Sequence, residues 1–483
     1  MRLASGSLLV LLASGAAAQN VVEFDLHRGF PGINVGVLPH LSPRATQLQE
    51  LANNITGSGY YCEVQVGTPP QTVNMLIDTG SSDTWVVSPR ADLCSSKQLQ
   101  FVLLDSCSAT YDETKSSTFK MIQKDGFNIT YLDRRNALGD YISDDFTVAG
   151  ITINDLQLGL VTKAPRGTGI MGIGYSANVA TLNEYPNIID QLVLQKRIAV
   201  KAYSLFLNDR RSSSGSILFG GVDTGKFVGP LSILPILRPA DAEGAEGQHI
   251  AFAVSLTGLG ALHTDGAKAD FNPSLFDAAV VPAVLDSGST LSYLPAKLTA
   301  PLYKHLGAVF ERLYTNMTFV DCRLLASDPD LEIAFSFHGG ATVRVPVTEV
   351  VLDVLAPLHQ TLLASSFPGF QKACLFGVQS TASIPDSAAL QETTFSLLGD
   401  TFLRSAYVVY DLDHHQIGIA QANLNSTQSN VVELKAGAPG LPSLMGVKEQ
   451  ERKSGAPGGV RVAGGREALV LGVGLALLGS RLW

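Results

Sequence analysis

The sequence is short of basic residues. Of its 483 residues only 34 are Lys or Arg, against 43 Asp or Glu, and the formal net charge is -9. Because a nucleic-acid-binding surface needs clustered Lys and Arg, and no such run stands out, the composition argues against a nucleic-acid partner. A low content of Lys and Arg suits a protein that works in acid, where carboxylates lose their charge.

Other features are also scarce. The long Ser/Thr repeats of structural cell-wall proteins are absent, which argues against that class. The adjacent His414 and His415 lie where an alternating strand pattern turns back. Because neighbouring strand residues point to opposite faces, these two make a poor chelate, and the sequence predicts neither a metal nor an organic cofactor.

Both ends of the chain resemble targeting signals. Residues 1–18 join a basic start to an apolar run and three alanines, which predicts a secretory signal peptide. Residues 426–467 predict a linker and spacer rich in Ser, Gly and Pro. The apolar tail, 468–483, is too short to span a bilayer. Together these features are typical of a GPI-attachment signal with Ser454 as attachment site, nearby glycines as competitors, and a tail that docks on the protein as the alternative.

One short pattern occurs twice at domain-scale spacing. An apolar run leads into Asp78 followed by Thr-Gly-Ser, and a second leads into Asp286 followed by Ser-Gly-Ser. One copy is a weak signal, because Asp favours such turns, but two copies form a strong one. Gly80 and Gly288 let the backbone turn sharply. Hydroxyls that can hydrogen-bond carboxylates or neighbouring backbone come from Thr79, Ser81, Ser287 and Ser289.

Two neighbouring carboxyl groups that share one proton can hydrolyse a peptide bond with water. The ionised group activates the water, and the protonated group stabilises the developing oxyanion. Because like charges in contact cannot both ionise easily, the pair titrates as a unit, and the sequence leaves open which Asp holds the proton.

With these two loops the sequence resembles the pepsin-like aspartic proteases over about residues 60–422, with Asp78 and Asp286 as the catalytic pair. The resemblance implies an all-β, bilobal fold of two similar β-barrel-like lobes with the active-site cleft between them. It also implies cleavage of extended peptides at acidic pH by a protein that we expect to be monomeric. With the GPI-like tail, the chain resembles the yapsin-like surface proteases of fungi. A catalytically inactive binding or cell-wall protein is the alternative, and both intact Asp loops argue against it.

Other stretches support the resemblance. The segment from Phe127 to Phe146 predicts a β-hairpin, which in the family is a flap that excludes water and clamps the substrate. Tyr131 occupies the position of the flap tyrosine, which hydrogen-bonds a tryptophan matching Trp85. The implied substrate-binding residues are Gly80, Tyr131, Asp133, Gly288, Ser289 and Thr290, and the implied supporting residues are Thr79, Ser81, Trp85 and Ser287.

Asp133 stands two residues beyond the flap tyrosine. Several fungal relatives carry Asp there and accept Lys or Arg before the scissile bond, because a carboxylate can face the first side-chain pocket. The alternative is a solvated Asp neutralised by Arg134 or Arg135.

The chain also contains an internal repeat. Gly169–Gly174 and Leu397–Asp400 are both apolar stretches with glycine, and in the family each such strand crosses behind one Asp loop. Short helices are expected near Ile188–Gln195 and Lys297–Leu306. The expected domains are an N-terminal lobe at 51–238 and a C-terminal lobe at 239–425, preceded by a prosegment at 19–50 that is cut at or after Arg44.

The clustering of the cysteines suggests the pairs Cys94–Cys107, around a surface loop, and Cys322–Cys374. Pepsin-like relatives place lobe-internal disulfides at matching positions. Cys62 is then a buried thiol or, alternatively, pairs with another chain. Sequons predict glycosylation at Asn54, Asn128, Asn316 and Asn425.

Overall fold

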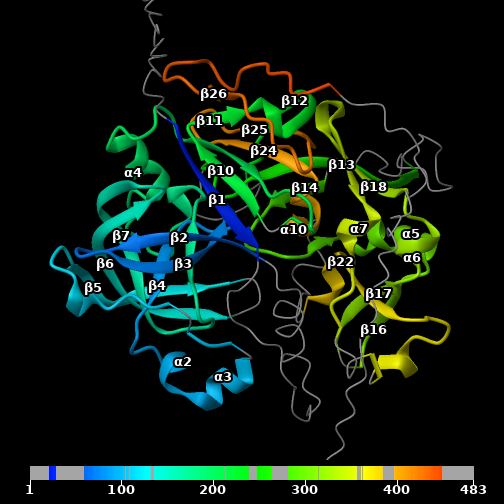
Figure 1. Cartoon of the computed structure of the whole chain (residues 1–483), viewed down its shortest axis with the longest axis horizontal. Helices are drawn as coiled ribbons and strands as arrows, with labels where there is room; N and C mark the ends of the chain where they lie inside the picture. Colours follow the sequence, from blue (N-terminus) through cyan, green and yellow to red (C-terminus); the bar gives the residue numbers. More distant parts are fainter. Residues whose placement is uncertain are drawn as a thin grey trace, which may run out of the picture. The chain divides into compact units, whose positions relative to one another are not determined.

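The computed structural model is built mainly from β-strands joined by short helices (Figure 1). The expected all-β fold with two similar halves is confirmed. The residues that the structure describes are 21–28, 59–103, 105–107, 109–131, 135–212, 214–238, 247–263, 281–313, 315–355, 360–361, 363–384 and 396–448.

The largest sheet has thirteen strands and combines both halves of the chain. Strands β24 and β25, from the end of the C-terminal half, pair with β9 and β12 of the N-terminal half, so this sheet joins the halves. Its order is β12 (Phe227–Pro235), β25 (Gln416–Ala422), β24 (Ala406–Asp411), β9 (Ala202–Phe206), β10 (Ser214–Phe219), β1 (Val22–Arg28), β2 (Tyr60–Val66), β3 (Gln71–Asp78), β8 (Gly169–Gly172), β4 (Thr84–Val87), β7 (Ile151–Lys163), β6 (Asn136–Val148) and β5 (Lys120–Thr130).

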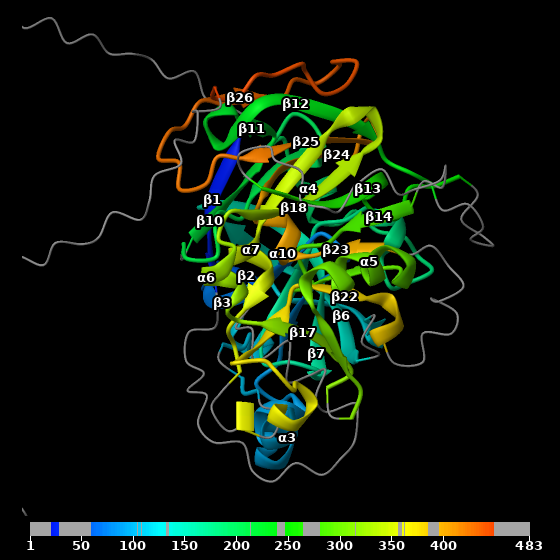
Figure 2. The ribbon, with the colours of Figure 1, turned by 90° about the vertical axis from the view of Figure 1, so that its right-hand side faces the viewer.

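The C-terminal half contributes smaller sheets, whose strands β13, β14 and β18 lie side by side in Figure 2. The seven-stranded sheet has the order β19 (Thr342–Pro346), β18 (Leu331–Phe337), β13 (Ala253–His263), β14 (Val281–Leu285), β23 (Ser396–Leu398), β15 (Ser292–Leu294) and β22 (Val378–Ser380). A four-stranded sheet contains β16 (Val309–Glu311), β17 (Met317–Asp321), β21 (Ala373–Phe376) and β20 (Val351–Leu352). In a separate two-stranded sheet, β11 (Gly221–Asp223) of the N-terminal half pairs with β26 (Val431–Glu433).

The internal repeat expected from the sequence is present in the pairing of the strands. In the first half β3 runs parallel to β8, β8 is antiparallel to β4, and β4 is parallel to β7. In the second half β14, β23, β15 and β22 follow one another with the same sequence of directions. Both apolar-Gly strands, β8 and β23, therefore lie beside the strand that leads into an Asp loop, as predicted.

The helices are short and have local causes. Before α4, Asn187 accepts hydrogen bonds from the Ile189 and Asp190 amides while the Asp190 carboxylate accepts one from the Asn187 amide, which forms a capping box. Helix α5 follows Pro295 and ends at Gly307, whose φ of 63° suits glycine. Both helices lie within a residue or so of the expected positions.

The α-helices are α2 (Asp92–Ser95), α3 (Lys97–Leu103), α4 (Ile188–Leu194), α5 (Ala296–Leu306), α6 (Leu324–Ser327), α7 (Val347–Val350) and α10 (Asp400–Leu403). Single 3-10 turns occupy Glu113–Lys115, Ser176–Asn178, Thr224–Lys226, His338–Gly340, Ala364–Ser366 and Thr381–Ser383.

The segment between Cys94 and Cys107 differs from the expected loop. It carries the whole of α3, and α2 ends inside it. The Gln100 side chain donates a hydrogen bond to the Leu93 carbonyl at 2.9 Å, and the buried Leu93 anchors α2 on the body of the protein. A polar-looking segment can therefore be helical when contacts outside it supply the stabilisation.

Two segments outside the predicted lobes belong to the folded body. Strand β1 lies in the predicted prosegment, yet it pairs with β10 over six positions and also with β2. Residues 426–448 fall in the predicted linker, but β26 pairs with β11 there, and Leu434 and Leu441 are buried. These two leucines complete an apolar cluster with Phe227 and Tyr407, so this segment belongs to the folded body at least as far as Leu441.

Candidate active site

Asp78 and Asp286 occupy matching places in the two halves. Asp78 is the last residue of β3, and Asp286 directly follows β14. The Asp78 carbonyl accepts a hydrogen bond from the Ile173 amide at 2.9 Å, and the Asp286 amide donates one to the Leu398 carbonyl at 3.0 Å. The apolar-Gly segments thus hold both loops from behind.

The two carboxylates have equivalent hydrogen-bond partners, each within its own loop. Asp78 accepts hydrogen bonds from the Gly80 amide at 2.8 Å and from the Ser81 hydroxyl at 2.5 Å. Asp286 accepts them from the Gly288 amide at 2.8 Å and from the Ser289 hydroxyl at 2.7 Å. Each turn therefore orients its own carboxylate, and both carboxylates are buried.

The hydroxyls of Thr79 and Ser287 join the two loops to each other. The Thr79 hydroxyl donates a hydrogen bond to the Leu285 carbonyl and accepts one from the Ser287 amide, each at 2.9 Å. The Ser287 hydroxyl donates to the Ile77 carbonyl at 2.9 Å and accepts from the Thr79 amide at 3.2 Å. This reciprocal arrangement brings together carboxylates from loops 208 residues apart.

The glycine of each motif faces the carboxylate of the other. A methyl group at Gly80 would lie 2.6 Å from the carboxyl carbon of Asp286, and one at Gly288 would lie 2.6 Å from that of Asp78. Real side chains essentially never approach so closely. Glycine is thus required at both positions because the loops meet there.

The carboxyl pair favours a retained proton. Burial, the negative charge of Asp78 and a hydrogen bond between the two carboxyl groups raise the pKa of Asp286 well above its usual range, although the bonds from Ser289 and Gly288 oppose the shift. At moderately acidic pH one carboxyl can be protonated while the other is ionised. The pair then offers a base and an acid in one place.

Tyr131 follows strand β5 of the hairpin and points to the same region. The indole nitrogen of the buried Trp85 donates a hydrogen bond to the Tyr131 hydroxyl at 2.6 Å. The Tyr131 amide donates to the Arg135 carbonyl at 2.9 Å. Burial and the charge of Asp78 raise the pKa of Tyr131, so its hydroxyl remains protonated. The pairing of Trp85 with Tyr131 that the resemblance implied is therefore present.

Asp83 was missed by the sequence-based reasoning. Its buried carboxylate accepts hydrogen bonds from the Tyr185 hydroxyl at 2.6 Å, the Ala180 amide at 2.7 Å and the Tyr141 hydroxyl at 3.1 Å. Burial raises its pKa. Because Tyr141 lies on flap strand β6, Asp83 connects the first Asp loop to the flap. The one signal in the sequence was an Asp between the motif and an apolar run.

Four of the remaining predicted residues lie in the described part of the chain, and three lie outside it. Thr290 is buried beside the second loop, and its carbonyl accepts a hydrogen bond from the Thr401 amide at 3.0 Å. Asn128 and Asn425 are exposed, whereas Asn316 is partly buried and donates to the Ser383 carbonyl at 2.6 Å. Asn54, Asp133 and Ser454 lie outside the described residues.

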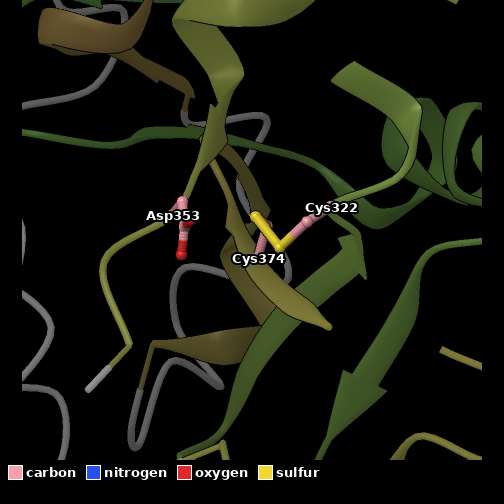
Figure 3. A group of neighbouring side chains, drawn as sticks. All are labelled: Cys322, Asp353 and Cys374. Atoms are coloured by element: carbon pink, nitrogen blue, oxygen red, sulfur yellow. A yellow bond between two sulfur atoms is a disulfide. The ribbon is translucent and has the colours of Figure 1, made fainter. Parts of the chain in front are cut away.

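Both expected disulfides, Cys94–Cys107 and Cys322–Cys374, are present. Cys62 is a free, buried thiol, and burial raises its pKa. Among the described residues, one group of three potential metal ligands gathers, namely Cys322, Cys374 and Asp353 (Figure 3). Its two sulfurs are bonded to each other, and Asp353 forms an ion pair with Lys372 at 2.5 Å. The group therefore offers no thiolate to a metal.

Comparison with known proteins agrees with the geometry. Residues 59–422 match the family described as eukaryotic aspartyl protease. The chain is 36% identical over 435 residues to a probable aspartic-type endopeptidase OPSB of Trichophyton verrucosum. The aligned region covers 89% of this chain and 81% of the relative. It is 34% identical over 394 residues to aspartic proteinase yapsin-3 of Saccharomyces cerevisiae, which covers 79% and 70%.

The raised pKa of Asp286 predicts a pH-dependent effect on stability. Because the folded state holds this proton to higher pH than the unfolded state, the stabilisation is complete in acid and is lost as pH rises through the folded pKa. Asp286→Asn removes the like-charge repulsion, so we expect its melting temperature to exceed that of the wild type at pH 7, with a smaller difference at pH 4. Thermal unfolding of both proteins, with the exposed Asp330→Asn as control, tests this, and an equal difference at both pH values would contradict it.

Proposed function

The chain belongs to the eukaryotic aspartyl protease family and is an aspartic endopeptidase, and we propose that Asp78 and Asp286 are its catalytic pair and act at acidic pH. The observation that carries this proposal is the matched set of hydrogen bonds around two facing, buried carboxylates. No described residue outside this site offers a comparable pair with a raised pKa.

The mechanism follows from one shared proton. The ionised carboxylate accepts a proton from a water held between the two groups while that water's oxygen attacks the scissile carbonyl carbon. The protonated carboxyl donates its hydrogen bond to the carbonyl oxygen, on which negative charge develops. The proton taken from water then passes to the leaving amine as the C–N bond breaks, so the pair ends with the single proton it began with.

The substrate is proposed to bind as an extended strand. The backbone beside Gly80 and Gly288, with Ser289 and Thr290, forms one wall of the site, and Tyr131 approaches from the flap. Polar backbone contacts would give affinity, and side-chain pockets would give specificity. The protein would act as a monomer, because both carboxylates come from one chain.

Peptide cleavage tests the proposal directly. We expect the secreted ectodomain to cleave a mixed peptide library at pH 4, and Asp78→Asn to lower kcat by roughly 10²–10⁴-fold because general acid–base catalysis is lost. Activity should fall as pH rises towards neutral, since the shared proton is then released. The exposed Asp330→Asn serves as the matched control. A correctly folded wild type that cleaves nothing, with or without processing, would favour an inactive binding protein.

Asp133 supports a proposal about specificity from its position in the sequence alone. A carboxylate two residues beyond Tyr131 could pair with Lys or Arg before the scissile bond. We expect the wild type to cleave matched peptides with Lys at that position faster than those with Leu, and Asp133→Ala to remove the difference. Equal cleavage of both peptides by the wild type would show that the Asp133 carboxylate does not select a basic side chain before the scissile bond.

The ends of the chain support a cell-surface location. The signal-peptide pattern at 1–18 and the small-residue, spacer and apolar-tail pattern from Ser454 to Trp483 suit a GPI anchor at the plasma membrane or cell wall. In the described part of the chain, no helix is long and apolar enough to cross a membrane.

Anchoring can be measured on whole cells. When the full chain is expressed in yeast, a phospholipase C specific for phosphatidylinositol should release it from membranes, whereas a chain ending at residue 467 should appear in the medium without treatment. Free secretion of the full chain, or retention after phospholipase treatment of wall-free cells, would contradict the GPI proposal.

A further inference from the structure

Arg166 lies in the short connection between β7 and β8, and its backbone is held in place. The Ala164 amide donates a hydrogen bond to the Asp92 carboxylate at 2.9 Å, and the Gly167 amide donates one to Asp105 at 2.8 Å. A methyl group at Gly167 would meet the backbone carbonyl oxygen of Ser106 at 2.0 Å. The connection thus packs against the Cys94–Cys107 segment, and the direction of the Arg166 side chain is constrained on both sides.

The Arg166 side chain reaches the wall beneath the flap. One terminal nitrogen donates a hydrogen bond to the Tyr61 hydroxyl at 2.8 Å. Tyr61 belongs to the apolar cluster that contains Trp85, and Tyr131 packs against the same cluster. The arginine therefore shares a wall with the hydrogen-bonded pair of Trp85 and Tyr131.

The guanidinium retains a free bonding position. Its Nε is buried and has no hydrogen-bond partner among the described residues. Within that part of the chain no carboxylate comes within ion-pair distance of it. An N–H removed from water without a partner costs free energy, and the cost is recovered when an acceptor arrives.

Arg166 is also coupled electrically to the catalytic region. Burial alone would lower the pKa of Arg166. Tyr61, Asp105, Tyr131 and Asp78 raise it by more than burial lowers it, so the pKa lies above its usual value. The side chain is therefore a permanent cation. Asp105 does not cancel it by contact, because its carboxylate is occupied by the Gly167 and Ser106 amides.

We propose that Arg166 is a specificity-determining residue that binds a carboxylate side chain, Asp or Glu, at one substrate position near the scissile bond. A planar guanidinium with an unused N–H matches a carboxylate in charge and shape. The inference rests on the proposed function, because it places an extended peptide under the flap. Selection of Lys or Arg through Asp133 would concern another position, so one library separates the two preferences.

The test uses peptides that differ only by Glu or Gln, scanned through each position around the cleaved bond. For the wild type we expect kcat/KM to favour Glu at a single position by roughly tenfold or more, the range of a charge-assisted hydrogen bond. The preference should grow between pH 3 and pH 6, as the substrate carboxyl ionises. Arg166→Met should bring the ratio close to one, and Arg166→Lys should retain part of it.

Lys163→Met is the matched control, because Lys163 is an exposed cation three residues away and should leave the ratio unchanged. A wild type that cleaves peptides with no Glu preference at any position would overturn this inference and leave the proteolytic function standing. Absence of all cleavage would overturn both. If Arg166→Met fails to fold, Arg166→Lys decides the question, since a ratio that this variant leaves unchanged at every pH would show that another cation binds the substrate carboxylate.

Discussion

The reciprocal hydrogen bonds of Thr79 and Ser287 are the constraint on which the site depends. Two carboxylates repel each other, and nothing in either half alone would hold them in contact. Each hydroxyl crosses to the other loop, donates to its backbone and accepts from it, so the loops close on one another with all four bonds inside the protein. Gly80 and Gly288 follow from this closure, because any side chain there would collide with the opposite carboxylate.

The rest of the fold supports that contact from outside. Strands β8 and β23 lie behind the two Asp loops, and the thirteen-stranded sheet joins strands of both halves, so the halves cannot separate without breaking a shared sheet. Asp83 ties the first loop to the flap through Tyr141. Burial of Asp286 beside Asp78 raises the pKa of Asp286. This raised pKa is unfavourable for stability at neutral pH, and it is the property that acid–base catalysis uses.

Much of this could be predicted from the sequence, because the repeated Asp motif and the apolar-Gly strands are local patterns. The two helices also followed from such patterns, the disulfides from the clustering of the cysteines, and the flap tyrosine from the resemblance to the pepsin-like proteases. The contacts of Asp83 and Arg166 could not be predicted, because their partners, such as Tyr185 and Tyr61, lie about a hundred residues away. The sequence predicts a linker where strand β26 lies, because the flanks of this strand are rich in Gly, Pro and Ser, and the pairing with β11 that holds it is long-range.

The most direct test of the account is the titration of the two aspartates themselves. Carbon-13 spectra of aspartate carboxyl groups, recorded from pH 3 to pH 8, would follow each protonation step in the wild type and in the Asp78→Asn and Asp286→Asn variants. We predict a carboxyl resonance that titrates far above the usual range in the wild type, is absent from Asp286→Asn, and titrates at lower pH in Asp78→Asn, where the like charge is gone and burial remains. Two aspartates that titrate independently near pH 4, unchanged when the other is replaced, would contradict a shared proton.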